Sequence, residues 1–280
     1  MRILTPAKIN LHLEVLGKRP DGYHEIQSLM QRVDLSDEVE VRAGGEGIRL
    51  VAEGETIPGG MDNLACRAAE LFCRQTGLTG NLEIRIRKRI PVAAGMGGGS
   101  SDAAAVLAAL NDLFRTGLDP GSLMEMGARL GSDVPFFLFP KPALARGRGE
   151  KLSAVGLPEH LGFLLMVPPF RISTPWSYET FDQLTGGKKK AGTNLRDSYP
   201  ALADLLPALK NDLEIPALSR YPEIGRMKEE VLRKGAKGAL MSGSGPLTFG
   251  LFPSREEAEG AARRFQLPGG WQSIVAEGIG

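Results

Sequence analysis

The sequence predicts an α+β protein of two domains. Residues 8–16 alternate between polar and apolar side chains, as a β-strand does, whereas residues 101–115 carry an Ala-rich helix pattern. A chain of 280 residues is long enough for two hydrophobic cores. Prolines and glycines between residues 140 and 158 mark a change in composition. We therefore expect an N-terminal nucleotide-binding domain over residues 1–155 and a C-terminal substrate-side domain over residues 156–280.

The first predicted strand has one apolar and one polar face, because successive side chains of a strand point in opposite directions. The apolar set is Ile9, Leu11, Leu13 and Val15, and the polar set is Lys8, Asn10, His12 and Glu14. On the pattern alone, we expect the polar face to be exposed to solvent. Turn residues follow at 17–22, and further strands are predicted at 23–33, 38–43 and 47–52.

Three helices are predicted in the rest of the first half. The first begins at Asp62-Asn63 and ends at Gly77, the second covers residues 101–115, and the third covers residues 122–130. Residues 132–135 (Ser-Asp-Val-Pro) predict another helix start, with a side-chain cap and a proline in the first turn.

The second half predicts an α+β layer with an antiparallel sheet. Strands are expected at 163–167, 238–241, 247–252 and 271–276, and helices at 174–181, 222–234 and 254–265. A glycine-rich turn, residues 242–245, lies between two of these strands.

A glycine-rich segment connects the strand pattern at 82–87 with the helix predicted from Ser101. Its three successive glycines, Gly97 to Gly99, let backbone N–H groups approach a ligand closely. The first N–H groups of a helix lack partners within it and favour an anion, so this segment predicts a phosphate site. The spacing fits neither a Walker loop nor a dinucleotide fingerprint. A linker or a helix cap without a ligand is the alternative.

Composition and charge exclude several other classes of protein. The net charge is +1 and the basic residues are scattered, so we expect no nucleic-acid partner. Cys66 and Cys73 are seven residues apart on a helical pattern and are expected in the core. No apolar run approaches 18 residues and no signal peptide is visible, so we expect no membrane association and a cytoplasmic location. The expected oligomeric state is a monomer or a weak homodimer.

Three motifs in order resemble those of the GHMP kinase superfamily. Residues 91–104 (Pro-x3-Gly-Met-Gly-Gly-Gly-Ser-Ser-x-Ala-Ala) resemble its nucleotide loop, residues 6–11 its first motif and residues 240–246 its third. Two further stretches, residues 19–25 (Arg-Pro-Asp-Gly-Tyr-His-Glu) and 131–137 (Gly-Ser-Asp-Val-Pro-Phe-Phe), resemble one branch of that superfamily. Members of this branch phosphorylate a cytidine-diphosphate-linked methylerythritol.

The resemblance implies a fold and an activity. The fold is the two-domain GHMP kinase architecture, with an N-terminal domain like domain 2 of ribosomal protein S5, a ferredoxin-like C-terminal domain, and the active site in the cleft between them. The activity is transfer of the ATP γ-phosphate to the 2-hydroxyl of the small-molecule substrate, a step of non-mevalonate isoprenoid precursor biosynthesis. The implied cofactors are ATP and Mg²⁺, because ATP is used as its magnesium complex.

The resemblance also assigns ATP-binding and catalytic residues. The ATP-binding set is Asn63, Pro91, Val92, Ala93, Ala94, Gly95, Met96, Gly97, Gly98, Gly99, Ser100 and Ser101. Asn63 is near the adenine in the family, although on pattern alone it is a helix cap. Asp133 is the implied base and Lys8 its cationic partner, and both roles require the polar face of the first strand to be covered. Asp102 is more simply explained by the helix dipole than by a role at the phosphates.

The implied substrate-binding residues are Asn10, Tyr23, His24, Thr174, Tyr178, Gly243 and Ser244. Tyr23 and Tyr178 would stack on the cytosine, and imidazole or backbone groups near His24 would read its edge. On pattern alone, Tyr23 is a half-buried strand aromatic, and residues 243–245 form a tight turn. The protein ligands of Mg²⁺ are left open, with Ser101 and Asp133 as candidates.

The sequence is also compatible with two other functions. The first is another kinase of the superfamily, acting on homoserine, mevalonate or a sugar; the segment Gly22-Tyr23-His24-Glu25 favours the cytidine compound over these. The second is a nucleotide-binding module without catalysis, against which the presence of both Lys8 and Asp133 argues.

Overall fold

The computed structural model describes residues 1–280, and the chain divides into two compact units. Unit 1 comprises Met1–Ala7, Leu35–Val92 and Gly97–Pro140, and unit 2 comprises Lys8–Asp34, Ala93–Met96 and Lys141–Gly280. Strands β1 (Arg2–Lys18) and β2 (His24–Ala43) contribute residues to both units. These units follow the chain differently from the predicted domains, and the boundary at residue 155 stays a prediction.

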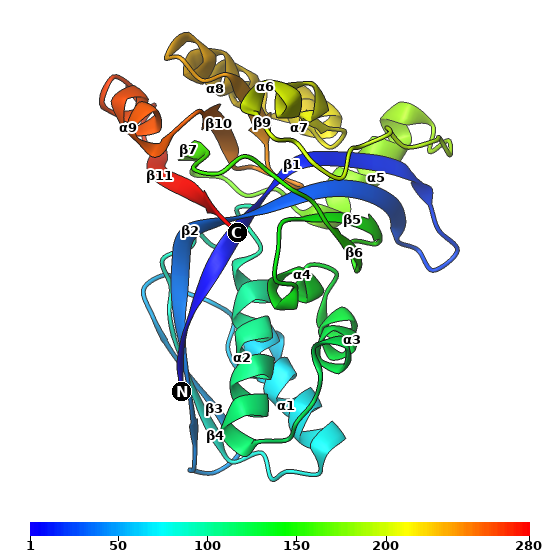
Figure 1. Cartoon of the computed structure of the whole chain (residues 1–280), viewed down its shortest axis with the longest axis vertical. Helices are drawn as coiled ribbons and strands as arrows, with labels where there is room; N and C mark the ends of the chain where they lie inside the picture. The colour runs from blue at the N-terminus through cyan, green and yellow to red at the C-terminus, as the bar shows by residue number, and fades with distance from the viewer. The chain divides into compact units, whose positions relative to one another are not determined.

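Unit 1 packs helices against one face of a sheet. Strand β3 (Ile48–Glu53) pairs in parallel with β4 (Leu82–Arg87), which pairs antiparallel with the C-terminal part of β2. Figure 1 shows α1 (Leu64–Thr76) and α2 (Gly98–Phe114) side by side, with α3 (Pro120–Leu130) and α4 (Val134–Leu138) beside α2. Ile84 and Ile86 of β4 pack with Phe72 and Val106 of the helices in one buried cluster.

The ends of the unit 1 helices follow from their sequences. Gly77 adopts the left-handed conformation, with φ of 70°, at the C-terminal end of α1, as glycine most readily does. Asp119 caps α3 by accepting a hydrogen bond from the Ser122 amide, and Pro120 occupies its first turn. Cys66 and Cys73 of α1 are buried free thiols, as predicted, and burial raises the pKa of each.

Unit 2 contains an antiparallel sheet, as predicted for the second half of the chain. Strand β7 (Gly162–Val167) pairs with β10 (Thr248–Phe252) and with β11 (Gln272–Ile279), and β10 also pairs with β9 (Gly238–Met241). The far end of β11 pairs with the N-terminal part of β2 at Val33. On the other side of β2, β5 (Ala143–Gly147) forms a hairpin with β6 (Lys151–Ala154).

The helices of unit 2 cover its sheet and the end of β1. Helices α8 (Pro222–Arg233) and α9 (Arg255–Arg263) pack on β10 and β7, and Figure 1 shows them on the same side of these strands. Helices α5 (Thr174–Thr185) and α7 (Glu214–Arg220) pack together and share a buried cluster with Leu13 and Val15 of β1. Between them along the chain lie the short α6 (Leu202–Leu205) and β8 (Lys210–Asn211), which pairs in parallel with β1.

Several predicted element boundaries are wrong. The strands expected at 23–33 and 38–43 are one continuous strand, β2, because no glycine or proline interrupts it. Helix α2 begins at Gly98 rather than Ser101, so two glycines lie inside its first turn. The elements that the sequence did not predict, namely β5, β6, β8, α6 and α7, are all short.

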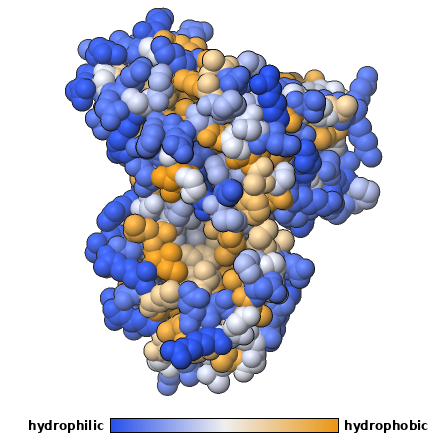
Figure 2. All heavy atoms as spheres, in the orientation of Figure 1, coloured by the Kyte–Doolittle hydropathy of each residue, from blue (hydrophilic) through white to orange (hydrophobic).

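Hydrophilic side chains predominate on the face of the molecule drawn in Figure 2, with apolar side chains between them. The two β-strands β2 and β4 carry arginines and glutamates that pair on the surface, among them Arg42 with Glu40 and Arg85 with Glu83. No helix is both long enough and apolar enough to cross a membrane.

A close approach at Gly162 gives a test of the unit 2 packing. A Cβ atom at this first residue of β7 would overlap the carbonyl group of Ser254, which precedes α9. Because neither backbone can yield without moving α9, we expect Gly162→Ala to lower the free energy of unfolding by about 1–3 kcal/mol. Chemical denaturation measures this change.

Gly260→Ala is the matched control within α9. The atoms nearest to a Cβ there are guanidinium ends 3.9 Å away, so the substitution has room and adds helix propensity. We expect no loss and a gain of up to about 1 kcal/mol. Equal losses in both variants would contradict the packing described at Gly162.

Candidate active site

The polar face of β1 is buried. Lys8, Asn10, His12 and Glu14 are 4%, 1%, 1% and 3% exposed, so the solvent-facing polar side expected from the pattern alone is wrong. The apolar residues on its other face, Ile9, Leu11, Leu13 and Val15, are buried as well. Burying polar groups is unfavourable unless they find hydrogen-bond partners. These four side chains therefore need specific partners within unit 2.

Lys8 lies against the end of the glycine-rich segment that belongs to unit 2. Its backbone N–H donates to the Met96 carbonyl at 2.9 Å. Its Nζ donates to Asn10 Oδ1 at 2.6 Å and to the Gly95 carbonyl at 3.2 Å. The structure thus brings together four of the predicted site residues: Lys8, Asn10, Gly95 and Met96.

The second glycine-rich turn completes this corner of unit 2. Ser242 accepts from the Asn10 backbone N–H at 3.1 Å and donates to the Gly95 carbonyl at 3.1 Å. A Cβ on Gly243 would lie 3.5 Å from Lys8 Nζ and 3.3 Å from Asn10 Oδ1. Gly243 therefore joins the predicted residues, and Ser242, which sequence reasoning did not assign, joins the turn to β1.

The remaining residues of the predicted ATP segment take different local roles. Pro91 is buried, and the Val92 N–H donates to Glu55 Oε2 at 3.0 Å. Ala93 is exposed to solvent, and its backbone adopts the left-handed conformation, with φ of 58°. The Ala94 carbonyl accepts a hydrogen bond from the Leu247 N–H at 3.3 Å. These contacts hold residues 91–94, which precede the glycines, in place.

Gly97 is the N-cap of α2 in unit 1, with φ of 68°. The first turn of this helix contains Gly98, Gly99, Ser100 and Ser101, whose N–H groups lie at the positive end of the helix dipole. Gly99 is exposed, whereas Ser101 is buried and its hydroxyl has no hydrogen-bond partner. The first turn therefore offers backbone donors together with one unsatisfied hydroxyl.

A buried charge cluster lies beneath this first turn. Lys88 forms ion pairs with Asp37 and, at 3.0 Å, with Asp102, and Thr5 donates to Asp102 at 2.9 Å. A Cβ on Gly98 would be 3.2 Å from Lys88 Nζ. Burial raises the pKa of Asp102 to about 6, although Lys88 opposes this change. The Asp102 carboxylate thus faces the buried lysine, and its expected interaction with the helix dipole stays a prediction.

Asn63 and Asp133 both precede helices of unit 1, but only Asn63 is a cap. Asn63 Oδ1 accepts from Ala65 N–H at 2.9 Å, and its Nδ2 donates to the Pro58 carbonyl at 3.0 Å. Both ends of the amide are therefore used locally, as the helix-cap alternative requires. Helix α4 starts after Asp133 with Pro135 in its first turn, as predicted, but the side-chain cap is absent.

The residues expected to bind the cytidine group lie at three places in unit 2. The His24 imidazole, at the start of β2, stacks on Tyr178 of α5 with ring centroids 4.7 Å apart. Thr174, at the start of α5, hydrogen-bonds the Ser244 hydroxyl at 2.8 Å. Tyr23 precedes β2 and is 52% exposed, so its interpretation as a half-buried strand aromatic is wrong. The Arg148 guanidinium lies over its ring, 4.7 Å from the centroid.

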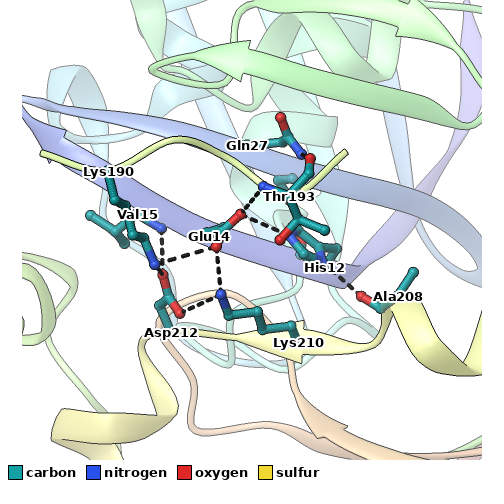
Figure 3. Close-up of polar contacts among 10 residues, drawn as sticks. His12, Glu14, Val15, Gln27, Lys190, Thr193, Ala208, Lys210 and Asp212 are labelled. Carbon is teal, nitrogen blue, oxygen red and sulfur yellow. Dashed lines mark hydrogen bonds and ion pairs between the residues drawn. The ribbon is translucent and has the colours of Figure 1, made fainter. Parts of the chain in front are cut away.

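The other half of the polar face of β1 is held by charges that sequence reasoning did not find (Figure 3). Glu14 pairs with Lys210 of β8 and Lys190, and accepts from the Thr193 N–H at 2.7 Å. Asp212 pairs with the same two lysines, at 2.7 Å to Lys190 and 3.4 Å to Lys210. Lys190, in the loop after α5, is therefore anchored to β1. No local signal reveals this network, because its members are far apart in the sequence.

Two pKa shifts follow from this burial. Burial disfavours the charged form of Glu14, but hydrogen bonds from Lys210 and Thr193 outweigh it and lower the pKa of Glu14 to about 2. Burial lowers the pKa of His12, whose Nδ1 donates to the Ala208 carbonyl at 2.7 Å. His12 is thus a structural, neutral imidazole.

Family models match both halves of the chain. The model described as the GHMP kinases N terminal domain matches residues 63–141, and that described as GHMP kinases C terminal matches residues 194–269. A protein of Geobacter metallireducens named 4-diphosphocytidyl-2-C-methyl-D-erythritol kinase is 45% identical over 280 residues, covering 100% of this chain and 99% of its own. One of the same name from Pelotomaculum thermopropionicum is 46% identical over 266 residues, covering 94% and 93%.

A solved structure is similar over the whole chain. The crystal structure of a 4-(cytidine 5'-diphospho)-2C-methyl-D-erythritol kinase superposes with a TM-score of 0.80 and is 35% identical, covering 100% of both chains. Relatives and structure agree with the fold class and with the branch of the superfamily that the motifs predict.

The network around Glu14 gives a prediction about stability. Glu14→Gln leaves Lys210 and Lys190 with a weaker partner, so we expect the free energy of unfolding at neutral pH to fall by about 1–3 kcal/mol. The folded-state pKa of Glu14 lies below its usual value of 4.5, so its stabilisation is complete above about pH 5 and is lost as the pH falls toward 2. Urea denaturation at a series of pH values measures both effects.

The control is Glu46→Gln, in the exposed turn between β2 and β3. This variant keeps the wild-type acid profile, whereas Glu14→Gln flattens it. An unchanged acid profile in Glu14→Gln would show that the network does not set the stability of unit 2 at low pH.

Proposed function

The chain belongs to the GHMP kinases, and we propose that it is an ATP-dependent kinase that phosphorylates the 2-hydroxyl of 4-diphosphocytidyl-2-C-methyl-D-erythritol. The observation that carries this proposal is the full-length similarity to kinases of that name, at 42–46% identity. Lys8 and Asn10, on the buried face of β1, and the glycine turn of α2 supply the polar groups that phosphoryl transfer needs. The reaction belongs to non-mevalonate isoprenoid precursor biosynthesis, for which we expect a cytoplasmic location.

We assign the ATP phosphates to the first turn of α2. Its backbone N–H groups and the positive end of the helix dipole favour an anion, and the exposed Gly99 leaves room for one. A Cβ on Gly98 would point at Lys88 and Ile90. The glycine at this position allows α2 to begin close to the buried Lys88.

Ser101 is the protein group that fits Mg²⁺ best. Its buried hydroxyl lacks a partner, and Mg²⁺ bound to ATP needs few protein ligands because phosphates and water supply most of its shell. When bound, the ion neutralises charge on the phosphates. The protein itself would contribute one ligand, the Ser101 hydroxyl oxygen in the first turn of α2.

Lys8 and Asp133 are the proposed catalytic residues. Lys8 Nζ donates to Asn10 Oδ1 and to the Gly95 carbonyl, and these two hydrogen bonds orient the ammonium group. We propose that Lys8 stabilises the negative charge that develops during transfer, and that Asp133 orients the acceptor hydroxyl and takes its proton. The Asp133 side chain makes no capping hydrogen bond to α4.

We propose that Tyr23, His24 and Tyr178 bind the cytosine and that Thr174, Gly243 and Ser244 line the substrate side of the site. The stack of His24 on Tyr178 and the hydrogen bond between Thr174 and Ser244 support this assignment, because they prearrange these groups within unit 2. Asn63 stays a proposed adenine neighbour, in addition to its role as a cap.

A substrate panel separates this function from its rivals. With ATP, we expect turnover of the cytidine compound and none of homoserine or mevalonate, measured by ADP release. Turnover of mevalonate or homoserine alone would establish another kinase of the superfamily. ATP binding without turnover of any alcohol would establish a non-catalytic module.

Replacing the proposed catalytic pair tests the mechanism. We expect Asp133→Asn and Lys8→Ala each to lower kcat by about 10²-fold or more, with ATP affinity nearly unchanged. If the two groups act on one transition state, the double variant loses much less than the product of the single effects. Fully multiplicative losses would contradict a joint role, and wild-type turnover in Asp133→Asn would remove it from the mechanism.

Ser101→Ala tests the magnesium assignment. We expect the concentration of Mg²⁺ that gives half-maximal ATP binding to rise by about tenfold, since one ligand oxygen is lost. Calorimetric titration of ATP with Mg²⁺ and with EDTA measures it, and the affinity in EDTA should not change. Thermal stability stays the same because the hydroxyl has no partner to lose. Ser100→Ala serves as the neighbouring control, and equal Mg²⁺ dependence in both variants would refute the assignment.

A further inference from the structure

Helix α5 holds the His24 imidazole by its face and by one edge. The Tyr178 ring stacks on it with an interplanar angle of 24°, and Asp182 Oδ1 and Oδ2 lie 2.9 and 3.0 Å from Nε2. Tyr178 and Asp182 are four residues apart, so they share one face of α5. The His24 side chain is 8% exposed, and this packing gives its ring a single orientation.

The contact with Asp182 determines which ring nitrogen carries the proton. A carboxylate only accepts hydrogen bonds, so Nε2 must donate. In the neutral imidazole, Nδ1 then keeps its lone pair and is an acceptor. The hydrogen bonds of the imidazole are those to Asp182. The other charged group that faces this carboxylate is Lys18, whose Nζ lies 3.7 Å from Asp182 Oδ2.

We propose that Asp182 is a positioning residue that fixes the His24 tautomer, so that Nδ1 accepts a hydrogen bond from the exocyclic amino group of cytosine. This inference rests on the proposed function, which supplies the cytidine substrate. Uracil has a carbonyl oxygen where cytosine has the amino group. Two acceptors would then face each other, and the enzyme discriminates against the uridine compound through a carboxylate that does not touch the base.

A purely structural role for Asp182, tethering α5 to β2, makes different predictions. A tether would affect stability and both substrates equally. If Asp182 instead fixes the tautomer, its removal changes which nitrogen of one imidazole is protonated, and it changes the ratio of kcat/KM between the cytidine and the uridine compound. Asp182→Ala removes the acceptor, Asp182→Asn retains an oxygen that can accept from Nε2–H, and Glu179→Ala removes an exposed acid from the same helix as a control.

The tautomer is read directly by long-range ¹H–¹⁵N NMR of histidine-labelled protein at about pH 8, where an ordinary imidazole is neutral. The chain has 3 histidines, which makes assignment simple. We expect the Nε2–H tautomer of His24 in wild type, Asp182→Asn and Glu179→Ala, and a mixture of tautomers in Asp182→Ala. His12, whose Nδ1 donates to Ala208, is an internal reference for the opposite tautomer in all four proteins.

Specificity is read from kcat/KM for the cytidine compound and its uridine analogue. In Asp182→Ala, we expect the cytidine-to-uridine ratio to fall by about tenfold or more, mainly through KM, with kcat for the cytidine compound within about twofold. Asp182→Asn should recover most of the ratio, and Glu179→Ala should keep it.

An unchanged His24 tautomer in Asp182→Ala overturns the inference, and so does an altered tautomer with an unchanged ratio. A wild-type enzyme that phosphorylates neither compound overturns the proposed function and base recognition with it. Failure of the inference alone is recognised by an active wild type and an Asp182→Ala variant with the same specificity.

Discussion

Burial of the polar face of β1 is the constraint on which unit 2 depends. Four polar side chains in one strand lose their hydration when the unit folds, and each loss must be offset by a specific partner. Along the strand, these partners divide by chemistry. Lys8 Nζ donates to Asn10 Oδ1 and the Gly95 carbonyl, and Asn10 Nδ2 donates to the Ser28 hydroxyl, whereas Glu14 meets two lysines. The same strand thus carries an ammonium group hydrogen-bonded to amide and carbonyl oxygens at one end and a salt-bridge network at the other.

The two ends of the strand therefore have different roles: the network around Glu14 stabilises unit 2, and Lys8 is proposed to take part in the reaction. The network of Glu14, Lys190, Lys210 and Asp212 is anchored on both sides and connects β8 and the loop after α5 to β1 (Figure 3). It fixes the strand from which Lys8 projects without contacting the proposed reacting groups. Unit 1 contains a similar buried charge cluster, in which Lys88 lies between Asp37 and Asp102 and packs against the first turn of α2.

How far the sequence predicted the molecule depended on the range of the interactions involved. Helix α1 and strands β4 and β7 are defined by local periodicity and by residues such as Gly77, and their predictions are confirmed. The exposure of a strand face depends on what packs against it, so the alternation in β1 could not show that its polar side is buried. The partners of Glu14 lie about 180 to 200 residues away in sequence, and no pattern near Glu14 points to them. The family resemblance supplied Lys8 and Asp133 as functional candidates, which local rules would have assigned to a solvent face and a cap.

The contrast between Asn63 and Asp133 shows where local rules stop. Both are Asn or Asp residues immediately before a helix, and the pattern predicts a cap in each case. Asn63 satisfies the rule, since its oxygen accepts from the second residue of the helix and its amide nitrogen is bound to Pro58. Asp133 occupies the same position before a helix of five residues and provides no cap. A stable protein tolerates a missing cap on so short a helix because packing of Val134 and Phe136 in the interior holds it in place. A helix start without its expected cap is the kind of local departure expected at a functional site, so the missing cap itself supports Asp133 as the proposed base.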